Sequence, residues 1–114
     1  MTQRERPPRR VIICSPWRGD TERHARYLDA CLRDSYARGE SPYASHAIGP
    51  RVLDDADPEQ RRQGSAAGLA WIEYADALAL YVDLGVSEGM RAEIQEALDT
   101  QTPIEERTIP GWEE

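Results

Sequence analysis

The sequence contains no lysine, no asparagine and no phenylalanine, so its 14 basic residues are all arginines. An arginine-only composition is consistent with a GC-rich genome. It also supplies planar guanidinium groups, which suit the binding of phosphates. The composition therefore leaves a compositional and a functional explanation of these arginines open.

Cysteine occurs only twice, and the sequence has no CxxC motif and no cluster of cysteine and histidine. Cys14 falls in an apolar run and Cys31 on the apolar face of a predicted helix, so we expect two free, buried thiols in a reducing compartment. The motifs HExxH and GxGxxG are also missing. Metal binding and dinucleotide binding therefore lack support, and we expect no metal or cofactor.

Long hydrophobic runs are missing as well. None approaches membrane-spanning length, and the opening MTQRERPPRR lacks the apolar core of a signal peptide. We therefore expect a cytoplasmic protein with no membrane partner. The net charge of -7 argues against a general nucleic-acid binder. With 39% hydrophobic residues and a mean hydropathy of -0.71, the 114-residue chain is one domain whose core is small or partly covered by a partner subunit.

The first part of the chain predicts an arm, a strand and a helix. Residues 1–9 are polar and contain two prolines, which predicts a flexible basic arm. The β-branched run in RVIICSP predicts a strand buried on both faces. Helical spacing follows from Thr21 to Arg38, with Asp20 as N-cap and Gly39 as stop. The residues expected to face inward are Ala25, Leu28, Cys31, Leu32 and Tyr36.

The rest of the chain predicts three more strands and two more helices. A second strand is placed at 43–46, and a helix capped by Asp57 runs from Pro58 to about Tyr74. The clearest buried strand is 77–82; a helix to about Leu98 and an edge strand over IEERTI follow. The domain therefore spans 10–110, followed by a tail, 111–114. The expected inward residues of the middle helix are Ala67, Ala70, Trp71 and Tyr74.

Strands that alternate with helices predict an α/β fold. We expect a Rossmann-like or flavodoxin-like parallel sheet of about four strands, with helices on both faces. Ligands of such sheets bind beyond the carboxyl ends of the strands. The loops that gather at this edge are SPWRGD, AIGPRVLDD and DLGVSEGM, and any chemistry is expected there.

The stretch GVSEGMRAEI opens the last helix and holds the first candidates. Ser87 can cap the helix, Gly89 lets a ligand approach the backbone, and the free amides of a helix start attract anions. Glu93 lies about one and a half turns further on, and its side chain leans back toward the crevice. Alternatively, Ser87 is only a cap and Glu93 only a solvated helix residue. Spacing alone leaves both interpretations open.

The other loops hold weaker candidates. Arg18 and Gly19 can bind an anion and Trp17 offers a flat face for a base, or the three form only a tight turn. Asp83 ends the third strand and faces the same crevice, where it either donates a proton or binds a hydroxyl group of a ligand, or it only caps the following turn. His46, placed at the end of the second strand, is either catalytic or a loop hydrogen-bonder. The acidic segment LDDADPE predicts a helix cap in a solvated loop more than a metal site.

Four segments together resemble the nucleoside 2-deoxyribosyltransferase-like superfamily and are most similar to its small phage and bacterial branch. They are VIICSPWRGD, the pair SH after the second strand, DPEQRRQG and ADALALYVDLGVSEGMRAEIQEAL. The resemblance covers roughly residues 10–100, and the motif S-x-G-M-x-x-E-I is its most specific part.

The resemblance implies a role for each matching residue. Glu93 takes the place of the nucleophile, and Ser87 that of the serine that contacts phosphate or a hydroxyl. The turn from Trp17 to Gly19 takes the place of the turn that lies against the sugar-phosphate. With the crevice candidates, the expected substrate-binding set is Ser15, Trp17, Arg18, Gly19, His46, Ser87, Gly89 and Met90.

Three positions depart from the family pattern. The related enzymes carry an aspartate that helps to handle the leaving base, and its position here is Gly68. Ile12 replaces an aromatic residue of the first strand, and Ser15-Pro16 replaces a Gly-Ser turn entry. Either another acid supplies the proton, with Asp83 as first choice, or this chain does different chemistry or only binds.

The expected function is hydrolysis or transfer at the N-glycosidic bond of a (deoxy)nucleoside or nucleotide, through a covalent glycosyl-glutamate intermediate. The first alternative is a non-catalytic protein that binds a nucleotide or nucleotide-derived ligand on the same fold. The second is a structural or interaction subunit. The resemblance also implies a homodimer or higher homo-oligomer, with a small-molecule nucleoside or nucleotide as partner and no nucleic acid.

Overall fold

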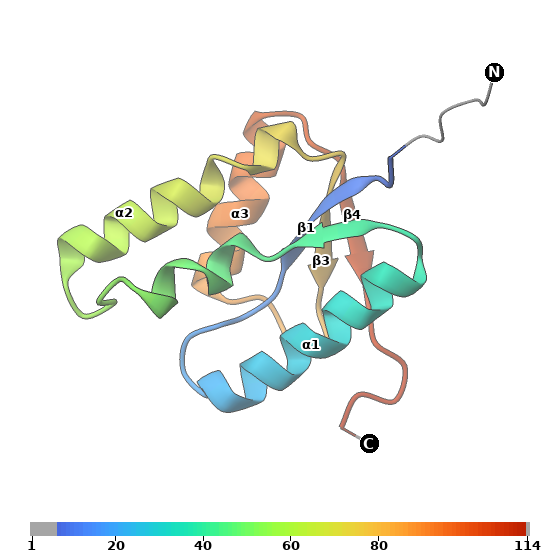
Figure 1. Ribbon diagram of the computed structural model, residues 1–114, viewed down its shortest axis with the longest axis horizontal. Coiled ribbons are helices and arrows are strands. Elements are labelled where there is room, and N and C mark those ends of the chain that lie inside the picture. Colours follow the sequence, from blue (N-terminus) through green and yellow to red (C-terminus); the bar gives the residue numbers. More distant parts are fainter. Residues whose placement is uncertain (1–6, 114) are drawn as a thin grey trace.

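The computed structural model describes residues 7–113 (Figure 1). Its centre is a four-stranded sheet in the order β2-β1-β3-β4, in which every neighbouring pair is parallel. The predicted α/β fold with a parallel sheet of four strands is therefore confirmed. Most of the expected arm, 1–9, lies outside the described residues. The strands are β1 (Arg10–Cys14), β2 (Ser41–Tyr43), β3 (Ala77–Tyr81) and β4 (Ile104–Arg107).

Three α-helices connect the strands, and each begins at a side-chain cap that the sequence contains. Asp20 accepts a hydrogen bond from the Arg23 amide, Asp57 from the Glu59 amide and Ser87 from the Met90 amide. Short 3-10 turns occupy much of the remaining connections. The helices are α1 (Thr21–Ala37), α2 (Pro58–Leu69) and α3 (Glu88–Asp99), and the 3-10 turns are η1 (Ser45–Ala47), η2 (Gly49–Arg51) and η3 (Ile72–Tyr74).

The alternating side chains of β1 and β3 divide the core into two apolar layers. On one face, Val11 and Ile13 pack with Tyr27 and Cys31 of α1. On the other face, Ile12, Cys14, Leu78 and Leu80 pack with η3 and α3, through Ile72, Met90 and Ala97. Full burial of such apolar side chains contributes about 1.5–3 kcal/mol each. Both faces of the two central strands are therefore covered, as the apolar runs predict.

The second strand lies earlier in the chain than predicted. The sequence pattern places it at 43–46, whereas β2 is Ser41–Tyr43 and His46 lies in η1. Pro42 stands inside this strand, and a proline lacks the amide that an internal strand needs. At the sheet edge that amide points away from the neighbour, so the proline is tolerated there.

The middle helix is shorter than predicted, and a different side of it faces the protein. It ends at Leu69, and the side chains expected to face inward are exposed, including Trp71 at 55% and Tyr74 at 75%. The reason is that α2 packs on η1, η2 and α3 and extends beyond the sheet (Figure 1). Ile72 of η3 takes the buried place instead. Tyr36 of α1, also expected to face inward, is 66% exposed, while Tyr27 is fully buried.

A charged network and the last residues cover the remaining sheet surface beside β4. The Arg107 guanidinium is buried and forms a two-pronged ion pair with Glu40, at 2.8 and 2.7 Å. The described residues of the predicted tail, 111–114, pack against the domain. The centroid of the Trp112 ring lies 4.9 Å from that of the Tyr27 ring, and Glu113 forms an ion pair with Arg23. None of the helices within residues 7–113 is both long and apolar enough to cross a bilayer.

Candidate functional site

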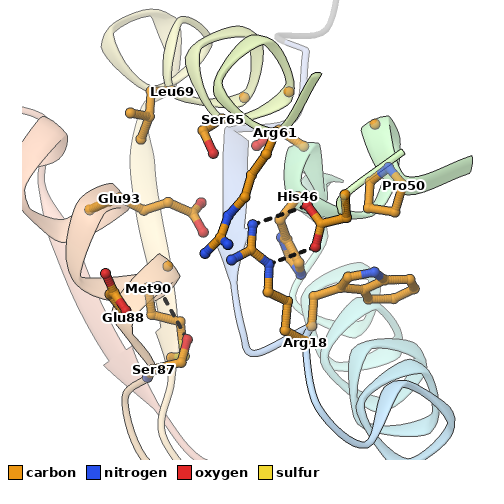
Figure 2. Close-up of a pocket in the computed structure, with 18 of the residues that line it drawn as sticks. Arg18, His46, Pro50, Arg61, Ser65, Leu69, Ser87, Glu88, Met90 and Glu93 are labelled. Atoms are coloured by element: carbon orange, nitrogen blue, oxygen red, sulfur yellow. Dashed lines mark hydrogen bonds and ion pairs between the residues drawn. The ribbon is translucent and has the colours of Figure 1, made fainter. Parts of the chain in front are cut away.

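A pocket of about 470 Å³ opens beyond the carboxyl ends of β1 and β3, at the edge where the loops were expected to gather. Its walls come from five parts of the chain: the loop after β1, the η1–η2 segment, the loop before α2, the inner side of α2 and the first two turns of α3. Figure 2 shows α2 and α3 as two walls with the loop residues between them. The volume is in the range of small-molecule sites.

The wall formed by α3 owes its shape to a tight turn and a serine cap. Gly85 adopts a positive φ of 84°, which reverses the chain after β3. The Ser87 hydroxyl then accepts a hydrogen bond from the Met90 amide at 3.3 Å, and the buried Met90 side chain anchors the first turn. A Cβ added at Gly89 would meet nothing within 4 Å, so this backbone is open to a ligand. The helix start thus turns its first amides toward the pocket, an arrangement that suits an anion.

Glu93 projects from the second turn of α3 into the pocket and is 7% exposed. Its Oε2 atom is buried and has no hydrogen-bond partner among the described residues. Burial raises the pKa of Glu93 to about 8, and the neighbouring Cys14 thiol opposes this rise only in part. With this pKa the carboxyl group is mainly protonated at neutral pH. It can ionise when a cation or ligand donor approaches it.

His46 and Ser15 form a polar pair at the base of the pocket. The Ser15 hydroxyl and His46 Nε2 lie 3.1 Å apart, and the Trp17 ring meets the imidazole edge-on with centroids 6.3 Å apart. Burial lowers the pKa of His46 to about 4, so the ring is neutral at physiological pH. His46 Nδ1 is buried without a partner among the described residues. The pair can therefore exchange a hydrogen bond with a ligand hydroxyl.

Arg18 spans the mouth of the pocket and pairs with a carboxylate of the opposite loop. Its Nε lies 2.8 Å from Asp55 Oδ2, and its terminal nitrogen lies 3.1 Å from Oδ1 (Figure 2). Both side chains are about half exposed, so this ion pair is weakly held. Arg18 can therefore leave Asp55 and bind an anionic ligand at small cost.

Two of the sequence candidates are not brought to the pocket. Asp83 lies at the α1 face of the sheet, where its carboxylate accepts hydrogen bonds from the Tyr27 hydroxyl at 2.6 Å and from the Ile109 amide at 2.9 Å. It is not among the residues that line the pocket, so the interpretation of Asp83 as proton donor needs correction. Gly19 also lies outside the lining and forms the turn before α1, with a φ of 90°. The remaining candidates line the pocket: Ser15, Trp17, Arg18, His46, Ser87, Gly89, Met90 and Glu93.

The comparison with protein families identifies residues 9–107 as a domain of unknown function, DUF7768. The chain belongs to the DUF7768 family.

A solved structure shares the fold of this DUF7768 domain. It is a 2-deoxyribosyltransferase from the psychrotolerant bacterium Bacillus psychrosaccharolyticus, with a TM-score of 0.64 and 17% sequence identity. The likeness covers 90% of this chain and 74% of the other. No curated protein matches the sequence. At this identity the likeness establishes a fold shared with a 2-deoxyribosyltransferase. The chemistry of the site has to be argued from the geometry of the pocket, because a fold by itself does not determine a function.

The sequence interpretation missed the wall that α2 contributes to the pocket. Arg61, Ser65 and Leu69 follow one another at intervals of four and line the pocket together. The apolar residues of this segment had predicted a different inward face, formed by Ala67, Ala70, Trp71 and Tyr74. In the structure no residue of α2 is buried, so this face does not form. The spacing of Arg61 and Ser65 is the signal that could have found this wall. It is weak by itself, because polar residues at helical spacing usually mark a solvated face.

Gly68, the position where the sequence resemblance leads us to expect an aspartate, lies in the pocket wall. A Cβ placed there would lie 3.5 Å from the Ser45 hydroxyl, an ordinary contact distance. The side chain is therefore missing although there is space for it. Besides Glu93, the carboxyl groups that line the pocket are Asp55, held by Arg18, and Glu88 in the first turn of α3.

Proposed function

We propose that the pocket binds a (deoxy)nucleoside or nucleotide and that Glu93 attacks its anomeric carbon. The observation that carries this proposal is the buried Glu93 carboxyl group, which has an unpartnered oxygen and lies in a pocket at the carboxyl ends of parallel strands. The fold shared with a 2-deoxyribosyltransferase supports it. The reaction is hydrolysis or transfer at the N-glycosidic bond.

In the proposed reaction, a carboxylate oxygen of Glu93 forms a bond to C1′ while the bond from C1′ to the base nitrogen breaks. The electron pair of that bond leaves with the base, which takes up a proton from an acid or from water. Water or a second base then attacks C1′ and releases Glu93, so the configuration is retained overall. With Asp83 outside the pocket, Glu88 and Asp55 are the lining carboxyl groups that can supply the proton.

Each remaining wall has a role in binding. The first-turn amides at Gly89 and the Ser87 hydroxyl bind a phosphate or a sugar hydroxyl, because a helix start favours negative charge. Arg18 exchanges Asp55 for an anionic group of the ligand. Trp17 packs against a ring, and the Ser15–His46 pair orients a hydroxyl group.

The direct experiment incubates the protein with a panel of ribo- and deoxyribonucleosides and their 5′-monophosphates and follows free base by chromatography. Glu93→Ala and Glu93→Gln are the inactive controls, and Glu106→Gln, an exposed change on β4, is the matched active control. We expect release of at least one base by the wild type and by Glu106→Gln only. Rapid quenching should leave a fraction of the protein heavier by one glycosyl group. Equal release by wild type and Glu93→Ala would overturn the proposal.

A second candidate function is the binding of a nucleotide without turnover. It is favoured by Gly68, which leaves the pocket without the expected acid, and by a Glu93 that is mainly protonated at neutral pH. A ligand at a hundred times its Kd stabilises a protein by about 2.7 kcal/mol. Under this alternative, one nucleotide raises the unfolding temperature and is recovered intact. Recovery of the free base from the same mixture decides for the enzyme.

We further propose a homodimer or higher homo-oligomer, because the core is small and aromatic side chains such as Trp71 and Tyr74 lie exposed. Light scattering coupled to size-exclusion chromatography measures the mass directly. A monomeric mass at micromolar concentration would contradict this expectation.

A further inference from the structure

Arg61 is a cation in the pocket wall that the proposed reaction has not yet used. It stands on α2 and lines the pocket, and Figure 2 shows its side chain extending from α2 into the pocket that Glu93 enters from α3. The ion pairs found within residues 7–113 include Arg62, which binds Glu59 on the outer side of α2, but not Arg61. The two adjacent arginines of α2 therefore differ in their surroundings. Arg62 forms an ion pair with Glu59, whereas Arg61, which lines the pocket, forms no ion pair with a carboxylate of the described residues.

The other groups around Glu93 have different roles or carry no positive charge. Arg18 is paired with Asp55 and is assigned to the anionic group of the ligand, and the imidazole of His46 is neutral because burial lowers its pKa to about 4. Burial also raises the pKa of the Cys14 thiol, so this group stays protonated. Taken by element, the charged or titratable groups that face Glu93 or share its pocket are Cys14 on β1, Arg18 on the following loop, His46 on η1, Asp55 on the loop before α2, Arg61 on α2 and Glu88 on α3.

We propose that Arg61 is a positioning residue for Glu93: its guanidinium moves onto the buried carboxyl oxygen when a ligand closes the pocket, and keeps that group ionised and aimed at the ligand. The inference rests on the proposed role of Glu93 as nucleophile, since only the carboxylate can attack. The Arg61 residue is exposed and its side chain is long, so its guanidinium can change position by rotation about the side chain's own bonds. Oε2 of Glu93 is the acceptor that this movement satisfies.

The first test measures the titration of Glu93 itself. Carbon-13-labelled glutamate gives one carboxyl resonance for each glutamate, and Glu93→Gln identifies the relevant one. A cation within about 4–6 Å lowers the pKa of a carboxyl group by about 1–3 units. We therefore expect Arg61→Gln to raise the Glu93 midpoint by about one unit with a saturating deoxynucleoside monophosphate, and by less in the free protein. Arg61→Lys should keep the wild-type midpoint, and Arg62→Gln is the matched control that changes nothing.

The second test separates positioning from simple ligand contact. If Arg61 acts through Glu93, Arg61→Gln lowers kcat/KM for base release about tenfold at neutral pH, and activity recovers at high pH, where Glu93 ionises without help. A KM raised equally at every pH, with an unchanged pH profile and an unchanged carboxyl titration, would sink the proposal. If no nucleoside or nucleotide is cleaved, the proposed function fails, and the titration of Glu93 in wild type and Arg61→Gln still decides the role of Arg61.

Discussion

Tyr27 and Asp83 exchange two hydrogen bonds between α1 and the end of β3. The Tyr27 hydroxyl donates to the Asp83 carboxylate at 2.6 Å, and the Asp83 amide donates to the Tyr27 oxygen at 3.0 Å. The Ile109 amide donates to the same carboxylate at 2.9 Å. Asp83 therefore joins α1, β3 and the segment after β4, and its negative charge is satisfied away from the pocket.

Tyr27→Phe should destabilise the protein and leave the pocket intact. The substitution keeps the buried ring and removes the donor to Asp83, which leaves a partly unsatisfied carboxylate at a cost of about 1–3 kcal/mol. Urea denaturation measures this loss, and Tyr36→Phe on the exposed side of α1 is the control with little effect. If the cleavage activity fell as well without loss of folded protein, Asp83 would have to act in the reaction after all.

Glu93 should make the protein less stable as the pH rises. The pKa of Glu93 is about 8 in the folded protein against 4.5 for an ordinary glutamate, so the folded state holds its proton more tightly. The free energy of unfolding therefore falls between about pH 4.5 and pH 8, by about 1.4 kcal/mol for each unit of pKa shift. Glu93→Gln should abolish this decline and be the more stable protein at pH 8. Denaturation at several pH values measures it; parallel curves for wild type and Glu93→Gln would contradict the buried, protonated state.

Breaking the buried ion pair of Arg107 and Glu40 should cost much more than losing a surface pair. Arg107→Gln leaves the buried Glu40 carboxylate with fewer donors, and removal of one partner of a buried pair costs about 3–5 kcal/mol. Replacing both partners by Met should restore most of this loss. Arg62→Gln, which breaks an exposed pair with Glu59, should change the stability by less than about 1 kcal/mol. Urea denaturation of the wild type and the three variants decides, and a small effect of Arg107→Gln would contradict the network.

The same ion pair predicts sensitivity to acid. Hydrogen bonds from Arg107 hold the pKa of Glu40 below its ordinary value of 4.5. A carboxyl group with a lowered pKa in the folded state contributes stability above the unfolded value and loses it as the pH falls through the folded value. We therefore expect Glu40→Gln to be less stable than wild type at neutral pH and the difference to shrink at the acid end. A difference that does not depend on pH would show that Glu40 acts by packing alone.

Gly68→Asp should strengthen catalysis if the proposed reaction occurs. There is room for the new Cβ beside Ser45, and the carboxyl group would enter the pocket wall at the position where the sequence resemblance leads us to expect an acid. General acid catalysis contributes about a hundredfold to ten-thousandfold in evolved sites, so a gain of about tenfold in base release is expected from an added acid. Gly68→Asn has nearly the same shape without the proton and is the matched control. Equal rates for both variants would show that the leaving base needs no acid at this position.

Much of the fold could be predicted because its signals are local. The apolar runs of β1 and β3, the caps Asp20, Asp57 and Ser87, and the period of α1 and α3 depend on neighbouring residues in the chain. Parallel pairing follows from the alternation of strands and helices. For the same reason the loop after β3 could be assigned to the carboxyl edge of the sheet, where Ser87 and Glu93 do lie.

The side chains that meet at the pocket could be predicted only in part. Glu93 shares a local motif with Ser87, so both were found together. Arg61 stands on a helix with little apolar patterning, and its direction depends on how α2 packs on η1 and α3. Asp83 follows a strand that reaches the pocket edge, yet the alternation of side chains along the strand turns it to the α1 face.

By itself the sequence determined the α/β class, the four strands, the helix starts and the loop that carries Glu93, because these depend on periodicity and caps within a few residues. Only the tertiary structure decided which side of α2 faces the pocket, that Asp83 is hydrogen-bonded to Tyr27, and that Arg61 and Glu93 line the same pocket. These depend on contacts between segments far apart in the chain, whose geometry follows from the packing of whole elements.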